Sequence, residues 1–170
     1  MTTDIGGQVA VVPQFVPVHQ TDPLAGPLLA ELAIEYTTRY GGDSDERYGE
    51  LLAYPAEEFE PPGGALIVAM SNGVPVAGGA FRRYDTTTAE LKRIWTASGH
   101  RRRGYGTRVV AELERMALVQ GYTRIYLTTG WRQPEAVALY LAAGYEPLYD
   151  QSLSSDEIGR HPFEKLLVAR

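Results

Sequence analysis

The sequence predicts an α+β fold, a mixed α/β arrangement in which a central, mostly antiparallel sheet is flanked by helices. Two apolar runs flank Ser71-Asn72-Gly73, and Asn-Gly between such runs is typical of an antiparallel hairpin. After Gly106, apolar residues recur at helical spacing, with a strand pattern on each side of them. A strand, a helix and a strand in this order predict a right-handed parallel crossover. Together these features predict an antiparallel meander that leads into one parallel unit.

The composition is that of one globular domain, which we expect to span residues 1–170. Hydrophobic residues make up 44% and charged residues 22% of the chain, so there is enough apolar surface to bury. No apolar run approaches the roughly 20 residues that cross a bilayer, and the first residues lack the pattern of a secretory signal. The chain has no cysteine, which excludes disulfide scaffolds, cysteine-bound zinc and thiol nucleophiles. We therefore expect a cytoplasmic protein with no membrane partner.

The first elements are a strand and two helices. A valine-rich strand is predicted over Val9–Val18, bounded by turn residues. Apolar residues at helical spacing then predict a helix that begins between Asp22 and Gly26 and ends at Gly41-Gly42. A second, more polar helix is predicted over Ser44–Tyr54.

The middle of the chain predicts three consecutive antiparallel strands and a helix. The strands are Ala65–Met70, Val74–Tyr84 and Ala89–Thr96, and the Asn-Gly turn joins the first two. The helix begins near Gly104 and ends at Gly121.

The last part of the chain predicts three strands and one helix. They are the strand Thr123–Thr129, a helix from Pro134 to Gly144, and the strands Tyr145–Tyr149 and Phe163–Val168, the last two joined by the polar loop Asp150–His161.

The charges are unevenly distributed along the chain. The net charge of -5 argues against a nucleic-acid partner, because such binding depends on neutralising phosphates. Lys92–Arg108 nevertheless holds six basic residues and no acid, whereas Asp43–Glu60 holds seven acids against Arg47 alone. An anionic ligand at the first run and a cationic one near the second would explain both. The alternative is that each run is a solvated face of the molecule.

The segment Arg101–Gly106 has the character of a phosphate-binding loop. It joins a predicted strand to the start of a helix, whose first backbone amides have no partner within the helix and carry a positive partial charge. The glycines let the backbone approach a pyrophosphate, and the arginines add charge-assisted hydrogen bonds. A dinucleotide fingerprint is excluded because Val109 stands at the third glycine position, and the Gly-Lys-Ser/Thr of a Walker loop is absent.

Three blocks in this order resemble the GNAT superfamily of acetyl-CoA-dependent N-acetyltransferases. The blocks are Ala89–Thr96, Arg101–Gly106 and Gln133–Tyr145, within a resemblance that covers Leu66–Val168. The resemblance implies the GNAT-like acyl-CoA N-acyltransferase fold and acetyl-CoA as co-substrate, with no metal. It also implies an amine acceptor on a small molecule or peptide. The runner-up is a non-catalytic acyl-CoA-binding or sensor domain that keeps the phosphate loop without turnover.

The resemblance implies where this chain would hold the cofactor. Backbone groups of Ile94 and Thr96 would bind the pantetheine arm, and Arg101–Thr107 would wrap the pyrophosphate. The sequence departs from the family where Trp95 replaces tyrosine, Arg102 replaces glycine and Gln133 replaces asparagine. The candidate cofactor-binding residues are Ile94, Trp95, Thr96, Arg101, Arg102, Arg103, Gly104, Tyr105, Gly106, Thr107 and Gln133.

Glu90 and Tyr140 are the candidate catalytic residues. An alkylamine is protonated at neutral pH and needs a base before it can attack, and the resemblance places a glutamate at Glu90 that acts directly or through water. The alternative is a solvent-facing strand residue paired with Lys92. The resemblance places Tyr140 near the cofactor sulfur, where its hydroxyl could protonate the leaving thiolate. The alternative is a core tyrosine, and the two roles are compatible.

Other residues are less informative. The histidines His19, His100 and His161 lack the spacing of metal ligands. Tyr36, Tyr40, Tyr48 and Tyr54 either line an acceptor pocket or pack between helices. A homodimer through the final strands is compatible with the sequence, which carries no signature of it.

Overall fold

The computed structural model describes residues 13–168, whose strands form one seven-stranded sheet in the order β1-β2-β3-β4-β5-β7-β6. Every neighbouring pair is antiparallel except β4 and β5, which are parallel. The predicted α+β fold with a mixed, mostly antiparallel sheet is therefore confirmed. The strands are β1 (Gln14–Pro17), β2 (Ala65–Ser71), β3 (Val74–Arg83), β4 (Thr88–Thr96), β5 (Arg124–Thr129), β6 (Glu146–Pro147) and β7 (His161–Leu166).

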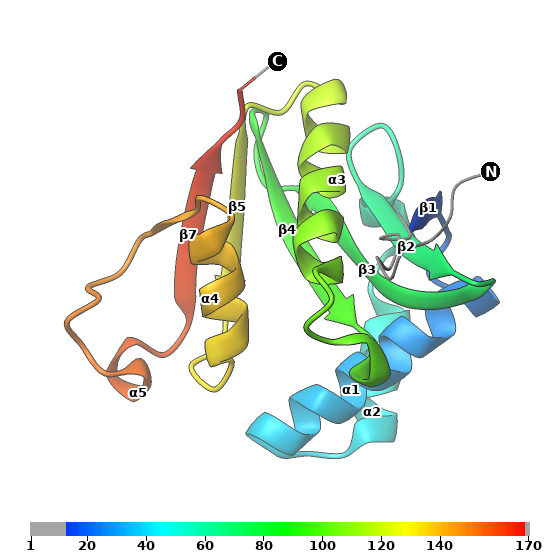
Figure 1. Ribbon diagram of the computed structural model, residues 1–170, viewed down its shortest axis with the longest axis horizontal. Helices are drawn as coiled ribbons and strands as arrows, with labels where there is room; N and C mark the ends of the chain where they lie inside the picture. The colour runs from blue at the N-terminus through cyan, green and yellow to red at the C-terminus, as the bar shows by residue number, and fades with distance from the viewer. Residues whose placement is uncertain (1–12, 169–170) are drawn as a thin grey trace, which may run out of the picture.

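The helices cover both faces of the sheet (Figure 1). Helices α3 and α4 lie over one face, and α1 and α2 lie against the other. The α-helices are α1 (Gly26–Tyr40), α2 (Ser44–Ala53), α3 (Tyr105–Val119), α4 (Pro134–Ala142) and α5 (Ser155–Ile158), and the 3-10 helices are η1 (Pro23–Ala25), η2 (Ala56–Phe59) and η3 (Ser98–His100).

Several predicted elements are confirmed together with their local cause. Asn72 and Gly73 have φ angles of 51° and 77°, as the tight turn between β2 and β3 requires. The sequence allowed the first helix to begin anywhere between Asp22 and Gly26, and the structure has a helix start at each end of this range. Asp22 caps η1 by accepting a hydrogen bond from the backbone amide of Leu24, and α1 then begins at Gly26.

The C-terminal part differs from the prediction. The predicted strand Tyr145–Tyr149 shrinks to Glu146–Pro147, and the predicted strand Phe163–Val168 begins earlier and ends at Leu166. The predicted loop 150–161 contains the one-turn helix α5, which begins with a reciprocal capping box between Ser154 and Glu157. Of the predicted first strand, residues 9–12 lie outside the described part of the chain, and the strand that is described is Gln14–Pro17.

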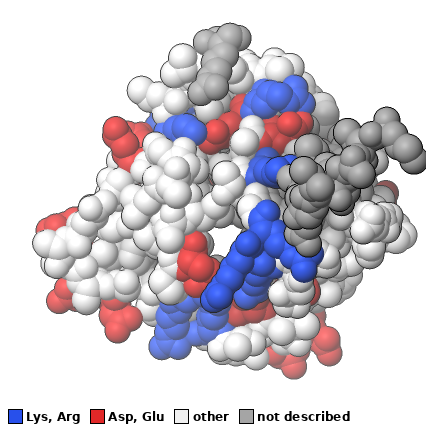
Figure 2. All heavy atoms as spheres, in the orientation of Figure 1, with Lys and Arg blue, Asp and Glu red and all other residues white. Residues whose placement is uncertain are grey.

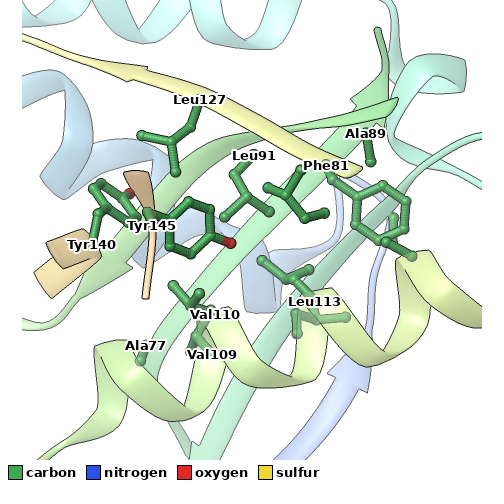
Figure 3. Packing of buried hydrophobic residues seen from close by; sticks show 14 of the residues in the cluster. Ala77, Phe81, Ala89, Leu91, Val109, Val110, Leu113, Leu127, Tyr140 and Tyr145 are labelled. Atoms are coloured by element: carbon green, nitrogen blue, oxygen red, sulfur yellow. The ribbon is translucent and has the colours of Figure 1, made fainter. Parts of the chain in front are cut away.

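The larger hydrophobic core lies between the sheet and α3. Val109 and Leu113 on α3 are fully buried and point toward Phe81 and Leu91 on the neighbouring strands (Figure 3). Each large apolar side chain buried in this way contributes roughly 1.5–3 kcal/mol to stability. A second cluster on the opposite face joins the sheet to α1, α2 and η2 and includes Trp95. The two clusters hold β4 firmly from both sides.

Strands β4 and β5 pair over only three residues, at the N-terminal end of each strand. Their register joins Thr88 to Arg124 and Glu90 to Tyr126, and beyond Glu90 the two strands have no pairing. Figure 1 shows them diverging toward the end of the sheet near α1. A β-bulge in β4 accompanies the divergence, because two residues, Arg93 among them, lie opposite one residue of β3. Arg93 has a φ angle of 60° at this bulge.

Candidate active site

A cavity of about 1130 Å³ lies where β4 and β5 diverge. Its walls come from β4 beyond Glu90, the loop before α3, the start of α4, and the α1 and α2 side of the molecule. Figure 2 shows a hollow in the surface with a band of Lys and Arg side chains beside it. The cavity is large enough for a ligand well above the size of a typical drug molecule.

The predicted phosphate loop forms one wall of this cavity. Arg102 and Gly104 both have positive φ angles, 64° and 80°, which turn the chain sharply into α3. No side chain caps the first turn of α3, so its first amides are available to an anion. Arg101 and Arg102 line the cavity, whereas the exposed Arg103 does not. The structure thus brings most of the predicted loop, Gly104–Thr107 included, to the cavity.

The far end of β4 forms a second wall. Ile94, Trp95 and Thr96 line the cavity on a stretch of β4 that has β3 on one side and no strand of residues 13–168 on the other. The backbone groups on the open edge suit a ligand that pairs with a strand. The Trp95 side chain is buried, and its Nε1 donates a hydrogen bond to Glu31 Oε2 at 2.6 Å. Trp95 therefore also holds α1 against the sheet.

Gln133 lies at the start of α4 and lines the cavity, but its side-chain oxygen is engaged within the protein. Gln133 Oε1 accepts hydrogen bonds from the Gly130 amide at 3.1 Å and from Thr129 Oγ1 at 3.3 Å. Tyr40 approaches the same oxygen with its hydroxyl at 3.4 Å. Gln133 therefore stabilises the turn between β5 and α4, and its Nε2 is the group left for a ligand.

Glu90 lies at the point where the two strands separate. Glu90 is only 7% exposed, so the alternative interpretation, a solvent-facing strand residue, is wrong. Arg82, directly opposite on β3, donates a hydrogen bond from Nε to Glu90 Oε1 at 2.8 Å. Lys92 Nζ lies farther away, at 3.9 Å from the same oxygen. Among the described residues no hydrogen bond reaches Oε2, so this oxygen is available to a water or an amine.

Tyr140, on α4, lines the same cavity and packs in the core (Figure 3). Its ring lies 5.6 Å from that of Tyr145 and 5.9 Å from that of Phe163, measured between centroids. Burial raises the pKa of the Tyr140 hydroxyl above its usual value, so this group keeps its proton at neutral pH. The structure thus gives Tyr140 both a packing role and a protonated hydroxyl at the cavity wall.

The α1 and α2 side of the cavity differs from the expectation of a cationic ligand near the acidic run. None of the seven acids in residues 43–60 lines the cavity, although Glu58 lies near it, 3.6 Å from Arg82. The single basic residue of that run, Arg47, does line it. Of the four candidate tyrosines, Tyr36, Tyr40 and Tyr54 line the cavity, and Tyr48 packs in the second core cluster.

Contacts between α1 and the β5–α4 turn close one end of the cavity. Arg39 donates hydrogen bonds to the carbonyl of Arg132 at 2.6 Å and to Glu135. The Tyr40 ring packs edge-on against Trp131 with 4.9 Å between centroids. Of these residues only Tyr40 was singled out from the sequence, because the contacts join positions more than 90 residues apart that no local pattern connects.

In residues 13–168, no group of three or more His, Asp or Glu side chains is arranged to hold a metal ion. In the same residues, no helix combines the length and apolar character needed to cross a bilayer.

Comparisons with known proteins agree with this geometry. A model described as the acetyltransferase (GNAT) family matches residues 28–145. Comparison with curated proteins gave no match. Solved structures were more informative, with 441 matching chains.

Three solved structures illustrate the similarity. A protein from Klebsiella pneumoniae assigned as an acyl-CoA N-acyltransferase is 23% identical with a TM-score of 0.70, over 94% of this chain and 100% of its own. An aminoglycoside 6'-acetyltransferase type Ii is 21% identical with a TM-score of 0.67, over 92% and 99%. An aminoglycoside 6'-N-acetyltransferase complexed with coenzyme A is 19% identical with a TM-score of 0.64, over 92% and 98%. At such identities the similarity shows a shared fold.

Proposed function

Since this chain belongs to the GNAT acetyltransferase family and is an acyltransferase, we propose that it transfers an acetyl group from acetyl-CoA directly to a primary amine. The observation that carries the proposal is that one cavity is lined by the phosphate loop, the open edge of β4, Glu90 and Tyr140. A donor, an acceptor, a base and an acid could therefore meet in one place. The single seven-stranded sheet supports treating the chain as one catalytic domain.

The cofactor is proposed to lie along β4 and the start of α3. The amides of the first turn of α3 and the side chains of Arg101 and Arg102 would bind the pyrophosphate. Backbone groups of Ile94 and Thr96 would pair with the pantetheine amides in the place that β5 leaves open. The available amides, the two cavity-lining arginines and the cavity volume all fit coenzyme A.

The proposed chemistry uses one proton acceptor and one proton donor. Glu90 takes a proton from the acceptor ammonium, directly or through a water at Oε2, and so frees the nitrogen lone pair. The nitrogen then forms a bond to the thioester carbonyl carbon, the carbon–sulfur bond breaks, and the nitrogen gives its second proton to water. Tyr140 donates its proton to the departing sulfur and recovers one from solvent. The products are an N-acetyl amine and a free thiol.

The acceptor is proposed to be an amine of a small molecule or peptide. Two of the solved structures named above are aminoglycoside acetyltransferases, so aminoglycosides belong in any panel of candidates. The test is to incubate the protein with acetyl-CoA and single amines, then measure thiol release and the acetylated product by mass spectrometry. Amine-dependent thiol release supports the proposal. Binding of acetyl-CoA without such release across the panel would indicate a sensor domain instead.

A further inference from the structure

We infer that the acceptor amine also carries a carboxylate and an apolar or aromatic body, as an amino acid does. The inference rests on the proposed function and concerns the α2-side wall of the cavity, defined as Tyr36, Arg47, Leu51, Tyr54, Phe59 and Arg93. This wall holds two guanidinium groups and no carboxylate. It is therefore suited to an anionic, partly apolar group.

Arg93 is the more buried of the two arginines. Its guanidinium donates to two neutral oxygens, the carbonyl of Leu51 at 2.7 Å and Gln20 Oε1 at 3.2 Å, and among the described residues it forms no ion pair. Burial lowers the pKa of Arg93 to about 10, so the group stays charged at neutral pH. A guanidinium has five N–H donors, and the two hydrogen bonds leave others for a ligand. A carboxylate would supply the missing counter-charge.

Arg47 adds a second, more mobile cation to the same wall. Its guanidinium lies over the Tyr36 ring at 4.6 Å from the centroid and pairs with Glu50 at 3.0 Å. An exposed pair between residues three apart on a helix is weak, so Arg47 can exchange Glu50 for a ligand at little cost.

The carboxylates elsewhere in the cavity already have partners. Glu35 pairs with Arg39 and Arg101, Glu90 with Arg82, and Glu135 with Arg39. Along the lining, seven Lys and Arg residues stand against three carboxylates, which is unfavourable for an acceptor with several positive charges.

The spacing along β4 relates the two ends of the acceptor. Arg93 follows Glu90 by three residues, at most about 10 Å along β4, because the β-bulge at Arg93 shortens the rise of an extended strand. An amine held at Glu90 and a carboxylate held at Arg93 thus fit within one small molecule. The half-buried Tyr54 ring, which lines the cavity and stacks on the buried Phe59, offers an apolar surface to its body.

The test compares acceptors that differ in the carboxylate. Phenylalanine, tyrosine and lysine are each assayed beside their decarboxylated amines and their carboxamides, with kanamycin as a polycation. Decarboxylation raises the basicity of the amine and amidation lowers it, so a loss seen with both analogues comes from the missing carboxylate. We expect kcat/KM to be about 10-fold or more higher for the best amino acid than for both analogues, since a charged hydrogen bond is worth that factor.

Two variants test whether the α2-side wall causes the preference for an acceptor with a carboxylate. Arg93→Gln and Arg47→Gln should each raise KM for the amino acid and bring its kcat/KM closer to those of the analogues. Arg115→Gln is the matched control, because Arg115 is exposed on α3 and lies outside the cavity. If Arg93→Gln does not fold, the comparison is made with Arg47→Gln alone.

The outcomes separate the two proposals. Equal or better use of the analogues, or a preference for kanamycin, would overturn the carboxylate inference and leave the acetyltransferase proposal intact. Thiol release with none of these amines, despite acetyl-CoA binding, would count against both. Unchanged selectivity in both arginine variants would show that the carboxylate is bound elsewhere, and would overturn the assignment to this wall.

Discussion

Arg82 and Glu90 are direct cross-strand partners, joined by a hydrogen bond of 2.8 Å from Arg82 Nε to Glu90 Oε1. Arg82 also lies 3.6 Å from Glu58, so it is held between two carboxylates. This arrangement orients Glu90 through one oxygen and leaves the other without a hydrogen-bond partner among the described residues. A substitution at Glu90 can therefore remove basicity without removing the contact with Arg82.

Glu90→Gln keeps the size of the side chain and an oxygen that can accept from Arg82. If Glu90 is the base, the rate at neutral pH should fall by on the order of 10²- to 10⁴-fold, while acetyl-CoA binding stays unchanged. Raising the pH toward the pKa of the amine should recover part of the loss, because free amine then forms unaided. Initial rates across pH 7–10 measure this. A wild-type rate with a verified acceptor would show that a water or another acid is the base.

Tyr140→Phe should lower the rate in a way that alkaline pH does not repair. Burial raises the pKa of Tyr140, so in the wild type the hydroxyl keeps its proton through the assay range and stays a donor for the leaving thiolate. The Tyr140→Phe variant lacks this donor at every pH. Tyr149→Phe is the control, since Tyr149 packs against Phe163 but does not line the main cavity. Equal activity of the two variants would limit Tyr140 to packing.

Gly104→Val should abolish the thermal stabilisation of the protein by CoA. Gly104 has a φ angle of 80°, where a β-branched residue is strained, and the loop must change shape to relieve it. Gly121→Val is a matched control, because Gly121 has a φ of 100° and open space around it but lies at the far end of α3. Both variants should lose stability, and only the first should lose CoA binding. Normal CoA binding by Gly104→Val would mean that the phosphate loop is misplaced.

Binding of CoA should weaken as salt rises, for both full-length and dephospho-CoA. In the proposed site Arg101 and Arg102 would attract the ligand through charge at the edge of the cavity, where salt screens the interaction. Arg102→Gln should lower the affinity at low salt and reduce its dependence on salt. Titration calorimetry at several ionic strengths gives both quantities, and an affinity independent of salt would contradict the electrostatic role.

Gly130→Ala should destabilise the contact between α1 and the β5–α4 turn. A Cβ at Gly130 falls on the Tyr40 side chain, within 2.6 Å of its Cζ, so one of the two segments must move. Overpacking of this kind costs about 1–3 kcal/mol, or several degrees in Tm. Gly49→Ala in α2, where nothing lies within 4 Å, should instead raise Tm slightly. A Tm at or above the wild-type value for Gly130→Ala would refute the close packing.

Local signals in the sequence predicted most of the fold. The Asn72-Gly73 turn, the glycine at the end of α3 and Pro134 at the start of α4 each act over a few residues, and the structure confirms all three elements. Helix α5 was missed because four residues carry too little apolar periodicity, although Ser154 and Glu157 did form a readable capping pair.

Only part of the site could be predicted from the sequence, because some of its contacts join residues that are far apart in the chain. Motif positions such as Glu90 and Gly104 could be identified from their neighbours in the chain. The β-bulge at Arg93 depends on how β3 pairs with β4, and the contact of Arg39 with Glu135 joins distant helices. The acidic run at residues 43–60 suggested a cationic ligand, but a count of charges does not show which side chains line the cavity. Arg47 lines it and the seven acids do not.

The short parallel pairing of β4 and β5 also has a mechanical consequence. Three paired residues join the two halves of the sheet, and Glu90 occupies the last of them, opposite Tyr126. A small rotation about this junction displaces each atom in proportion to its lever arm. Residues far along the diverging strands, such as Thr129 and Thr96, move most, and the carboxylate at the vertex moves least. A change in the width of the cavity therefore requires the contacts of Arg39 with Arg132 and Glu135 to change, whereas the contact of Glu90 with Arg82 can stay as it is.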